Sequence, residues 1–355
     1  MAGRTAIGLD IGTSAVRAAE LSFGKGQVSL ERLGQVEVPP GSVRDGEVLD
    51  PDAVGAAIKQ LWSISKFSHK KVALGVGNQK VVVRQVDLPW MPASDLRRSL
   101  PFQSQDLIPM PVDTVELDFH PLEEVTGSNG QRMIRGLLVA AARDMVLAAA
   151  SSATKAGLTP IAVDLTSFAL LRSVGRADPL GVTTDAETLV DIGARVTNII
   201  VQQGGAPRFV RILLMGGQDI TDAVAERLGV PVEQAEALKQ RFGADAASLH
   251  NGDGQAIAHV VDKSLQAFID EVRGSLDYFR ASTGSPTMSR LVLTGGGSLL
   301  PGIDRALAAA IRLPVVTGHP IAPLRRGKRG LTDEQLADLE PLAAVSIGLA
   351  LRALS

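Results

Sequence analysis

A short motif that occurs twice constrains the fold of this chain more than any other feature. Residues 7–14 read IGLDIGTS and residues 189–197 read LVDIGARVT, so in both places an apolar strand ends in Asp-Ile-Gly. The two carboxylates, Asp10 and Asp191, are 181 positions apart (191 minus 10), and an apolar strand pattern follows each copy. A single Asp-Ile-Gly is also typical of an ordinary strand-ending turn. Two copies in equivalent contexts predict an internal duplication with two equivalent loops.

Both loops have the chemistry of a phosphate-binding turn. Gly12 and Gly193 permit backbone conformations that a side chain would forbid, which lets main-chain N–H groups approach an anion. Thr13 and Ser14 add hydroxyl donors to the first loop. Two such loops facing each other would hold a polyphosphate from both sides.

The two aspartates suit a magnesium ion better than a phosphate. Asp10 and Asp191 are placed at strand ends, and like charges repel, so neither carboxylate would contact phosphate directly. Magnesium keeps much of its water shell and is typically held by one or two carboxylates together with phosphates. We therefore expect both aspartates to hold Mg²⁺ through water.

The composition limits the possible functions. A chain of 355 residues is long enough for two or three domains. Its 36 basic and 38 acidic residues give a net charge of −2, which provides no global attraction to nucleic acid or an anionic bilayer. The single Tyr and two Trp make base-stacking platforms improbable, so we expect no nucleic-acid partner. With no cysteine, disulfides and thiolate chemistry are excluded.

The first half of the chain reads as a β-meander, a helix and an inserted unit. Residues 15–23 and 27–39 continue the first motif as strands, a helix that Asp50 caps covers 51–64, and 71–76 returns as a strand. The stretch 81–158 then forms a strand-helix-hairpin-helix unit of a size that suits an insertion. Its first helix is capped by Ser94 and is expected to kink or restart at Pro101.

The second half repeats the meander. A short strand at 160–164, a helix at 166–174 and a linker at 175–184 precede it. The remaining predicted elements are strands at 196–203, 207–214, 290–294 and 313–316, helices at 217–228, 232–242, 255–282, 303–311 and 342–354, and a polar loop at 243–254.

A third motif lies between the strand at 290–294 and the next helix. Gly295, Gly296 and Gly297 would let a flat or phosphate-bearing ligand lie against bare backbone, although a glycine-rich hinge has the same sequence. Glu236 and Lys239 are three apart on one helix face and would offer an acceptor and a donor to a ribose or purine, or form an ordinary solvated face.

Taken together, these motifs resemble the superfamily of actin, heat-shock-protein and sugar-kinase ATPases over nearly the whole chain. The resemblance is closest to the PilM family of pilus assembly proteins. It includes the stretches DLIPMP at 106–111, AEALK at 235–239, GGSLLPG at 296–302 and IGLALR at 347–352, and the last three are also similar to the cell-division protein FtsA.

The resemblance implies an α/β, actin-like (ribonuclease H-like) fold of two lobes, with a duplicated βββαβα core and an inserted small α+β subdomain. The first lobe would comprise residues 1–80, 159–184 and about 340–355, the insert 81–158, and the second lobe 185–339.

The resemblance also implies roles for individual residues. Gly12, Thr13 and Ser14 would hold the β- and γ-phosphates of ATP, and Gly193 and Ala194 would hold them from the other lobe. The nucleoside would be faced by Glu236, Lys239 and the glycines around Gly296. Asp10 and Asp191 would order Mg²⁺ and water, and Asp164 would orient an attacking water or, alternatively, cap the helix that follows it. Arg17 is left out because its direction on the strand cannot be predicted.

The function implied is a cytoplasmic ATP-binding scaffold of the type IV pilus machinery, with at most slow ATP hydrolysis. Its partner would be the cytoplasmic N-terminal peptide of the inner-membrane protein PilN, bound in a groove that residues 81–111 border. FtsA relatives end in a linker and a membrane helix, whereas this sequence ends after its closing helix, so membrane contact is expected only through the partner. An FtsA-like division protein and a small-molecule kinase remain alternatives.

Two minor features point to no further site. The basic run at 325–329 is flanked by Pro323 and Gly330 and is interpreted as a solvated loop. The five histidines show no metal-ligand spacing, so no zinc site is expected.

Overall fold

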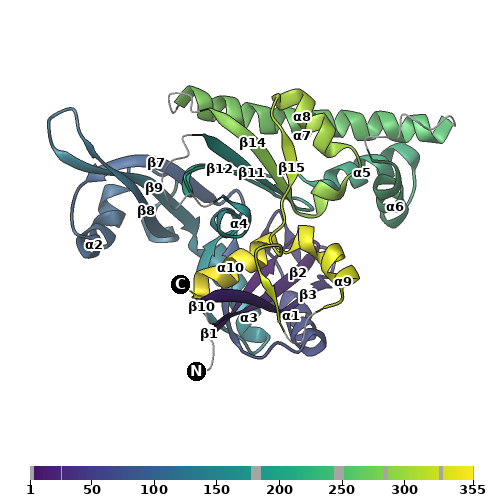
Figure 1. Ribbon diagram of the computed structural model, residues 1–355, viewed down its shortest axis with the longest axis horizontal. Coiled ribbons are helices and arrows are strands. Elements are labelled where there is room, and N and C mark those ends of the chain that lie inside the picture. Colours follow the sequence, from purple (N-terminus) through teal and green to yellow (C-terminus); the bar gives the residue numbers. More distant parts are fainter. Residues whose placement is uncertain are drawn as a thin grey trace.

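Two sheets of the same topology form the centre of the molecule (Figure 1), a computed structural model that describes residues 4–24, 26–176, 185–243, 252–282, 287–327 and 331–354. In the first sheet the order is β10-β6-β1-β2-β3-β16, and in the second it is β13-β12-β11-β14-β15. In both, an antiparallel meander continues into strands parallel to its first member. The structure therefore has the duplication that the repeated motif predicts.

The strands of the two sheets follow the predicted segments closely. Those of the first sheet are β1 (Arg4–Ile11), β2 (Ala15–Gly24), β3 (Gln27–Glu37), β6 (Lys71–Val76), β10 (Thr159–Leu165) and β16 (Arg325–Arg326). Those of the second sheet are β11 (Ala186–Ile192), β12 (Thr197–Gln203), β13 (Ala206–Leu213), β14 (Met288–Thr294) and β15 (Val315–Thr317). A separate short hairpin joins β4 (Val43–Arg44) to β5 (Glu47–Val48).

Helices cover both faces of the first sheet. On one face α1 (Pro51–Ser65) and α3 (Arg143–Lys155) pack Ile58, Leu61 and Met145 against Leu9 and Leu74. Helix α1 begins as predicted, because Asp50 accepts hydrogen bonds from Asp52 N and Ala53 N at 3.0 Å each and a proline follows it.

The other face is covered by α4 (Thr166–Val174) and α10 (Ala344–Leu354), which Figure 1 shows between the two sheets. Glycines allow these backbones to touch. A Cβ on Gly8 would lie 2.1 Å from Ser346 O, and one on Gly348 would lie 1.8 Å from Ala169 O. Helix α10 therefore packs directly on β1 and α4, which explains its small residues.

The second sheet has its own helical layer. The helices are α5 (Gly217–Leu228), α6 (Val232–Phe242), α7 (Gly252–Ser282) and α8 (Ile303–Ile311). Figure 1 shows α7 and α8 along the outer side of this sheet. Phe268, Val272 and Phe279 of α7 are buried together with Val190 and Leu291 in the core of this lobe.

The insert is a three-stranded sheet with one helix. Its strands β7 (Val81–Pro89), β8 (Val115–Thr126) and β9 (Arg132–Ala142) have the order β7-β9-β8, and α2 (Ala93–Gln103) covers one face. The 3₁₀ turn η1 (Val112–Thr114) leads into β8. In Figure 1 this unit projects to the left of the two lobes.

The predicted cap of α2 and the predicted restart of this helix at Pro101 are wrong. The residue before the helix is Pro92 and no side chain caps it, so Ser94 is not the cap. The helix continues through Pro101 to Gln103 without a restart. Because Pro101 lies in the last turn, it breaks little of the helical hydrogen-bond ladder.

The predicted boundary of the insert needs a correction at its end. Helix α3, which 81–158 includes, packs Met145, Ala149 and Ala153 into the core of the first lobe and not against α2. The predicted unit is compact only up to β9. Residues after Ala142 belong with the first sheet, because the apolar face of α3 meets α1 there.

The boundary of the second lobe at 339 also needs a correction. Helix α9 (Asp333–Leu339) was not predicted, and its Leu336 packs with Leu21 and Leu30 of the first sheet. Strand β16 pairs in parallel with β3, so Arg325 and Arg326 form a short exposed edge strand and not a simple loop. The 3₁₀ turn η4 (Glu340–Leu342) then leads into α10.

Some predictions lie outside the described residues. These are Lys25 of the first turn, residues 177–184 of the linker, residues 244–251 of the polar loop, and Lys328 and Arg329 of the basic run. In the part of the chain that the structure describes, none of the helices combines the length and the apolar character needed to span a bilayer.

Candidate functional site

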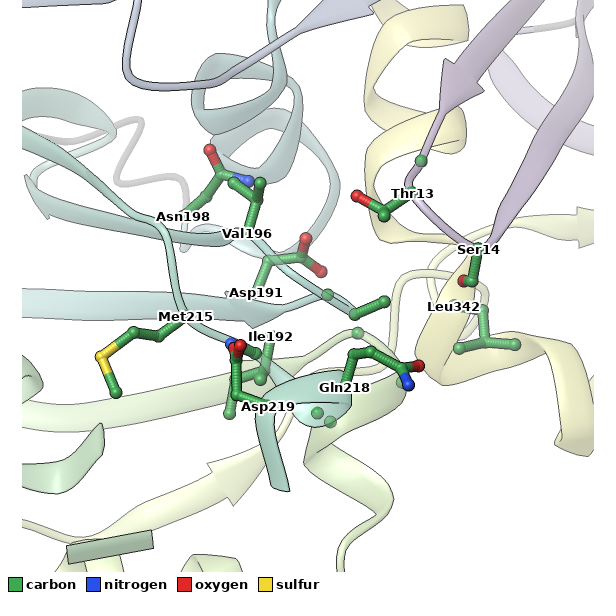
Figure 2. Close-up of a pocket in the computed structure, with 18 of the residues that line it drawn as sticks. Thr13, Ser14, Asp191, Ile192, Val196, Asn198, Met215, Gln218, Asp219 and Leu342 are labelled. Atoms are coloured by element: carbon green, nitrogen blue, oxygen red, sulfur yellow. The ribbon is translucent and has the colours of Figure 1, made fainter. Parts of the chain in front are cut away.

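A cleft of about 860 Å³ lies between the two lobes and brings the three predicted motifs together. Figure 2 shows Thr13 and Ser14 of the first lobe on one side of it and Asp191 and Gln218 of the second lobe on the other. The predicted site residues that line it are Asp10, Gly12, Thr13, Ser14, Asp191, Gly193, Ala194, Glu236, Lys239, Gly295, Gly296 and Gly297. Asp164 is the one predicted site residue that does not line it.

The two loops have the same local geometry. Gly12 N donates to Ala15 O at 3.0 Å and Gly193 N donates to Val196 O at 2.9 Å, so equivalent residues close equivalent turns. A Cβ on Gly193 would lie 2.7 Å from Val196 O, which makes glycine necessary at that turn. The residues of both turns, Gly12 to Ser14 and Gly193 with Ala194, line the cleft.

Asp10 and Asp191 are both buried at the cleft, in an environment that disfavours the charged form of their carboxyl groups. Burial raises the pKa of Asp10 to about 6; Arg17 opposes this rise and the charge on Asp191 adds to it. Burial also raises the pKa of Asp191, although a 2.9 Å hydrogen bond from Thr294 and the charge of Arg17 lower it. Two carboxylates destabilised by burial in one cleft are suited to a divalent cation.

This arrangement fits Mg²⁺ held jointly by the protein and a ligand. No group of three His, Cys, Asp or Glu side chains that could hold a metal occurs within the described ranges. Magnesium commonly takes one or two carboxylates, several waters and substrate phosphates. Asp10 and Asp191 would supply the carboxylates, and the ion would supply the positive charge that brings a polyphosphate close to them.

The raised pKa of Asp10 predicts a gain in stability when its charge is removed. Its pKa is about 6 in the folded chain against an ordinary value of 3.8, so the folded state binds the proton more tightly and loses stability as pH rises from about 4 to 6. Asp10→Asn should therefore stabilise the ligand-free protein at pH 8 by about 2 kcal/mol and by much less at pH 4.5. Urea unfolding at both pH values measures this, and an equal effect at both would contradict it.

Helix α5 holds the second loop in place. Gly217 N donates to Gly193 O at 3.0 Å and Gln218 N donates to Ala194 O at 2.7 Å. A Cβ on Gly216 would lie 2.4 Å from Gly193 O, so only glycine fits between the helix and the loop. Arg195 reinforces the contact through Asp219 of α5 at 2.6 Å.

The three successive glycines also press against the second loop. Gly295 has φ +83° and a Cβ there would lie 2.4 Å from Ile192 O, while a Cβ on Gly297 would lie 2.2 Å from Ile192 Cγ2. Gly296 has only Leu342 at 3.4 Å. Gly295 and Gly297 are thus needed for packing. All three glycines line the cleft at the start of the 3₁₀ turn η3 (Gly296–Leu299), so no side chain projects from them into it.

Glu236 and Lys239 are neither a solvated face nor a free acceptor-donor pair. Lys239 Nζ donates to Glu236 Oε2 at 2.7 Å, Gly217 O at 3.0 Å and Thr221 Oγ1 at 2.9 Å, which uses all three of its protons. Burial alone would raise the pKa of Glu236, but the hydrogen bonds from Lys239 and Thr221 lower it. The pair fastens α6 to the start of α5, and Glu236 Oε1 keeps acceptor capacity beside its bond from Gln240.

Arg17, Asn198 and Thr166 are three of the polar residues lining the cleft that were not predicted as site residues. Arg17 pairs with Asp10 across the first hairpin, and Asn198 occupies the equivalent position opposite Asp191. The signal was available, because a turn that closes between residues 12 and 15 brings residue 17 opposite residue 10. The third residue, Thr166, donates to Asn198 Oδ1 at 2.9 Å and could not be found from sequence because this contact joins the two lobes.

Asp164 has a different role from either one predicted. It forms an ion pair with Arg172 of α4, lies 4.0 Å from Arg352 of α10, and accepts from Leu165 N at 2.8 Å. No side chain caps α4. Asp164 thus neither orients a water in the cleft nor caps the helix, because its side chain turns toward α4 and α10 while Thr166, two residues on, reaches the cleft.

The comparison with known families supports this geometry. A family profile described as "Type IV pilus assembly protein PilM" matches residues 8–354. The chain belongs to the PilM family. A solved "PilM-PilN type IV pilus biogenesis complex" is similar to this PilM-family chain with 28% sequence identity and a TM-score of 0.86, covering 99% of this chain and 98% of that one.

More distant relatives agree on the fold. FtsA of Streptococcus pneumoniae serotype 2 is 23% identical over 333 residues, which are 83% of this chain and 71% of that protein. FtsA of Neisseria meningitidis serogroup B is 27% identical over 362 residues, covering 88% and 83%. The ADP-bound MreB5 of Spiroplasma citri has a TM-score of 0.52 at 14% identity, covering 97% of this chain and 94% of that one. The predicted actin-like α/β fold and the predicted family are confirmed.

Proposed function

We propose that this PilM-family chain is a cytoplasmic, ATP-binding scaffold of the type IV pilus machinery. The observation that carries the proposal is the cleft in which two equivalent glycine loops and two aspartates from different lobes face each other. Solved relatives of the same fold hold ADP, as in MreB5. Because Asp164 is paired with Arg172 outside the cleft, the proposal includes binding and at most slow hydrolysis.

Each lobe contributes donors to the phosphates in this proposal. The N–H groups and the hydroxyls of Thr13 and Ser14 bind from the first lobe, and the N–H group of Ala194 binds from the second, because Gly12 N and Gly193 N already donate within their own turns. Arg17, which lines the cleft opposite Asp10, adds positive charge. ATP would contact both lobes, and it favours the closed arrangement only by the extra binding free energy that it gains in that arrangement.

The proposed partner is the cytoplasmic N-terminal peptide of a PilN-type membrane protein, which would bring the chain to the inner face of the membrane. The support is the solved PilM-PilN complex at 28% identity. In the present structure we assign the peptide to the junction of the first lobe with the insert, along β10. Among the described strands β10 pairs only with β6, so its outer edge has backbone groups that an extended peptide could pair with.

The side chains around β10 suit an extended apolar peptide. Ile161 and Val163 are 52% and 38% exposed, which is unusual for β-branched residues on a strand. Strand β8 of the insert comes close to the far end of β10, because the ring of its His120 lies 5.5 Å from that of Phe168 of α4, which directly follows β10. Burial lowers the pKa of His120, and the charges of Asp118 and Asp164 oppose this fall. The predicted border at 81–111 thus needs β8 added to it.

Calorimetry with MgATP and with a synthetic PilN N-terminal peptide tests the function. We expect both ligands to bind the intact chain. Each of the variants Ile161→Asp and Val163→Asp should lower the affinity for the peptide at least about 10-fold and leave the affinity for MgATP unchanged. Ile64→Asp is the matched control, because Ile64 is 59% exposed on α1. Equal weakening by Ile64→Asp, or none by Ile161→Asp, would contradict the assignment of β10.

The similarity to FtsA keeps a division protein as the second candidate. Such a protein would bind lipid vesicles or assemble without a partner peptide. Sedimentation with vesicles and MgATP, with and without the peptide, separates the two, since the pilus scaffold should sediment only when the peptide is anchored in the vesicle.

A further inference from the structure

The insert is attached to both lobes and not only to the first. Along its central strand β9, Val139 and Ala141 are buried in the core of the first lobe. Leu137, which is 1% exposed, is buried instead with Leu189 and Ile200 of the second sheet. One continuous strand therefore connects the insert to two bodies that a cleft separates.

A chain of charges reinforces the contact with the second lobe. Arg135 of β9 holds Asp87 of β7 with two hydrogen bonds of 2.8 Å and lies 3.8 Å from Glu123 of β8. Glu123 in turn lies 3.5 Å from Arg208 of β13. Arg208 is the only one of these four residues that belongs to the second lobe, so its pair with Glu123 is the electrostatic link across the interface.

The same second sheet reaches the cleft on the neighbouring strand, β12. Strand β13 pairs with β12, which supplies Asn198, and Asn198 accepts hydrogen bonds from Thr166 at 2.9 Å and Ser167 at 3.1 Å at the start of α4. Asn198 and Thr166 both line the cleft. A rotation of the second lobe about α4 would thus move the cleft and the interface at Leu137 and Arg208 together.

We propose that the interface between the insert and the second lobe, centred on Leu137 and on the pair Glu123 and Arg208, couples nucleotide in the cleft to partner binding at β10. The proposal rests on the proposed function. When the lobes rotate, at least one of the two attachments of the insert must change. Packed interfaces shift between discrete arrangements, so this change moves the insert. The insert flanks the peptide site through β8, so its position alters the peptide affinity.

Thermodynamic linkage makes the coupling measurable from either side, because nucleotide must change peptide affinity by the factor by which peptide changes nucleotide affinity. The experiment measures the peptide Kd by fluorescence anisotropy with and without saturating Mg²⁺ and a non-hydrolysable ATP analogue. For the intact chain we expect the two Kd values to differ at least about 5-fold.

Charge reversal at the interface should bring the ratio of the two peptide Kd values close to one. Arg208→Glu places two carboxylates opposite each other, and we expect the ratio to fall below about 2-fold while each ligand still binds. The double variant Arg208→Glu with Glu123→Arg restores the pair and should restore the ratio. Glu124→Arg is the matched control, since Glu124 is the next residue on β8 but pairs with Arg132 inside the insert at 2.6 Å.

The outcomes separate the two proposals. If both ligands bind the intact chain and the ratio is one, or Arg208→Glu leaves it unchanged, or Glu124→Arg abolishes it equally, the coupling interface is wrong and the scaffold function stands. If the nucleotide or the peptide does not bind the intact chain, the proposed function is wrong and the coupling falls with it.

Discussion

Alanine at both Asp10 and Asp191 is expected to weaken binding of MgATP by about 100-fold and to leave metal-free ATP unaffected or slightly tighter. Both carboxylates are buried and line the cleft beside the two glycine loops. In the proposed function they would hold Mg²⁺ when it is present, whereas without Mg²⁺ they would only repel the phosphates. Their removal should therefore act in opposite directions in the two conditions.

Calorimetry with ATP in magnesium and in EDTA measures both affinities for the double variant. A conservative version, Asp10→Asn with Asp191→Asn, keeps the shape of the cleft and separates charge from volume. If the affinity of either variant for ATP falls equally with and without magnesium, the aspartates support the loops structurally and hold no metal. Thr294→Val, which removes the 2.9 Å hydrogen bond to Asp191, should have a much smaller effect on either affinity.

Alanine at Gly216 is expected to be among the most damaging single-methyl changes in the site. The added Cβ would lie 2.4 Å from Gly193 O, 2.5 Å from Ala194 O and 2.6 Å from Ala194 C, all backbone atoms of the second loop. No side chain can rotate away to relieve this contact, so the loop or the start of α5 must move. We expect a loss of about 3 kcal/mol in the free energy of unfolding and at least about 10-fold in nucleotide affinity.

Gly217→Ala is the matched control one residue further on. A Cβ there would lie 3.5 Å from Lys239 Nζ and 3.9 Å from both Gly193 O and Gly297 Cα, which are ordinary contacts. Alanine is also a better helix former at the first position of α5. Urea unfolding and nucleotide titration of both variants make the comparison. Equal losses at the two positions would mean that Gly216 is not pressed against the loop as the structure describes.

Local chemistry accounts for what could be predicted from the sequence. The turns at Gly12 and Gly193, the cap at Asp50 and the strand alternation depend on residues within a few positions of one another. Their duplication over half the chain then indicated two facing lobes, and all of the predicted site residues except Asp164 line one cleft. Arg17 was left out although the same turn geometry would have placed it opposite Asp10.

The errors concern choices that only distant segments make. The sequence of α3 suits either the insert or the first lobe, and its contact with α1 decided between them. The carboxylate of Asp164 ends a strand before a helix, as a catalytic group would, but Arg172 of α4 and Arg352 of α10 turn it from the cleft.

The two loops and the strands that carry them could be found without coordinates, because periodicity, glycine turns and capping act over short distances. The family was indicated by the resemblance of several motifs to those of known proteins. Three features became visible only in the folded chain: Lys239 is fully paired, Thr166 and Asn198 meet across the lobes, and the insert touches both lobes. These features arise where elements far apart in the chain compete for one buried surface or one polar partner. The free energy of packing settles that competition, and no local pattern in the sequence records it.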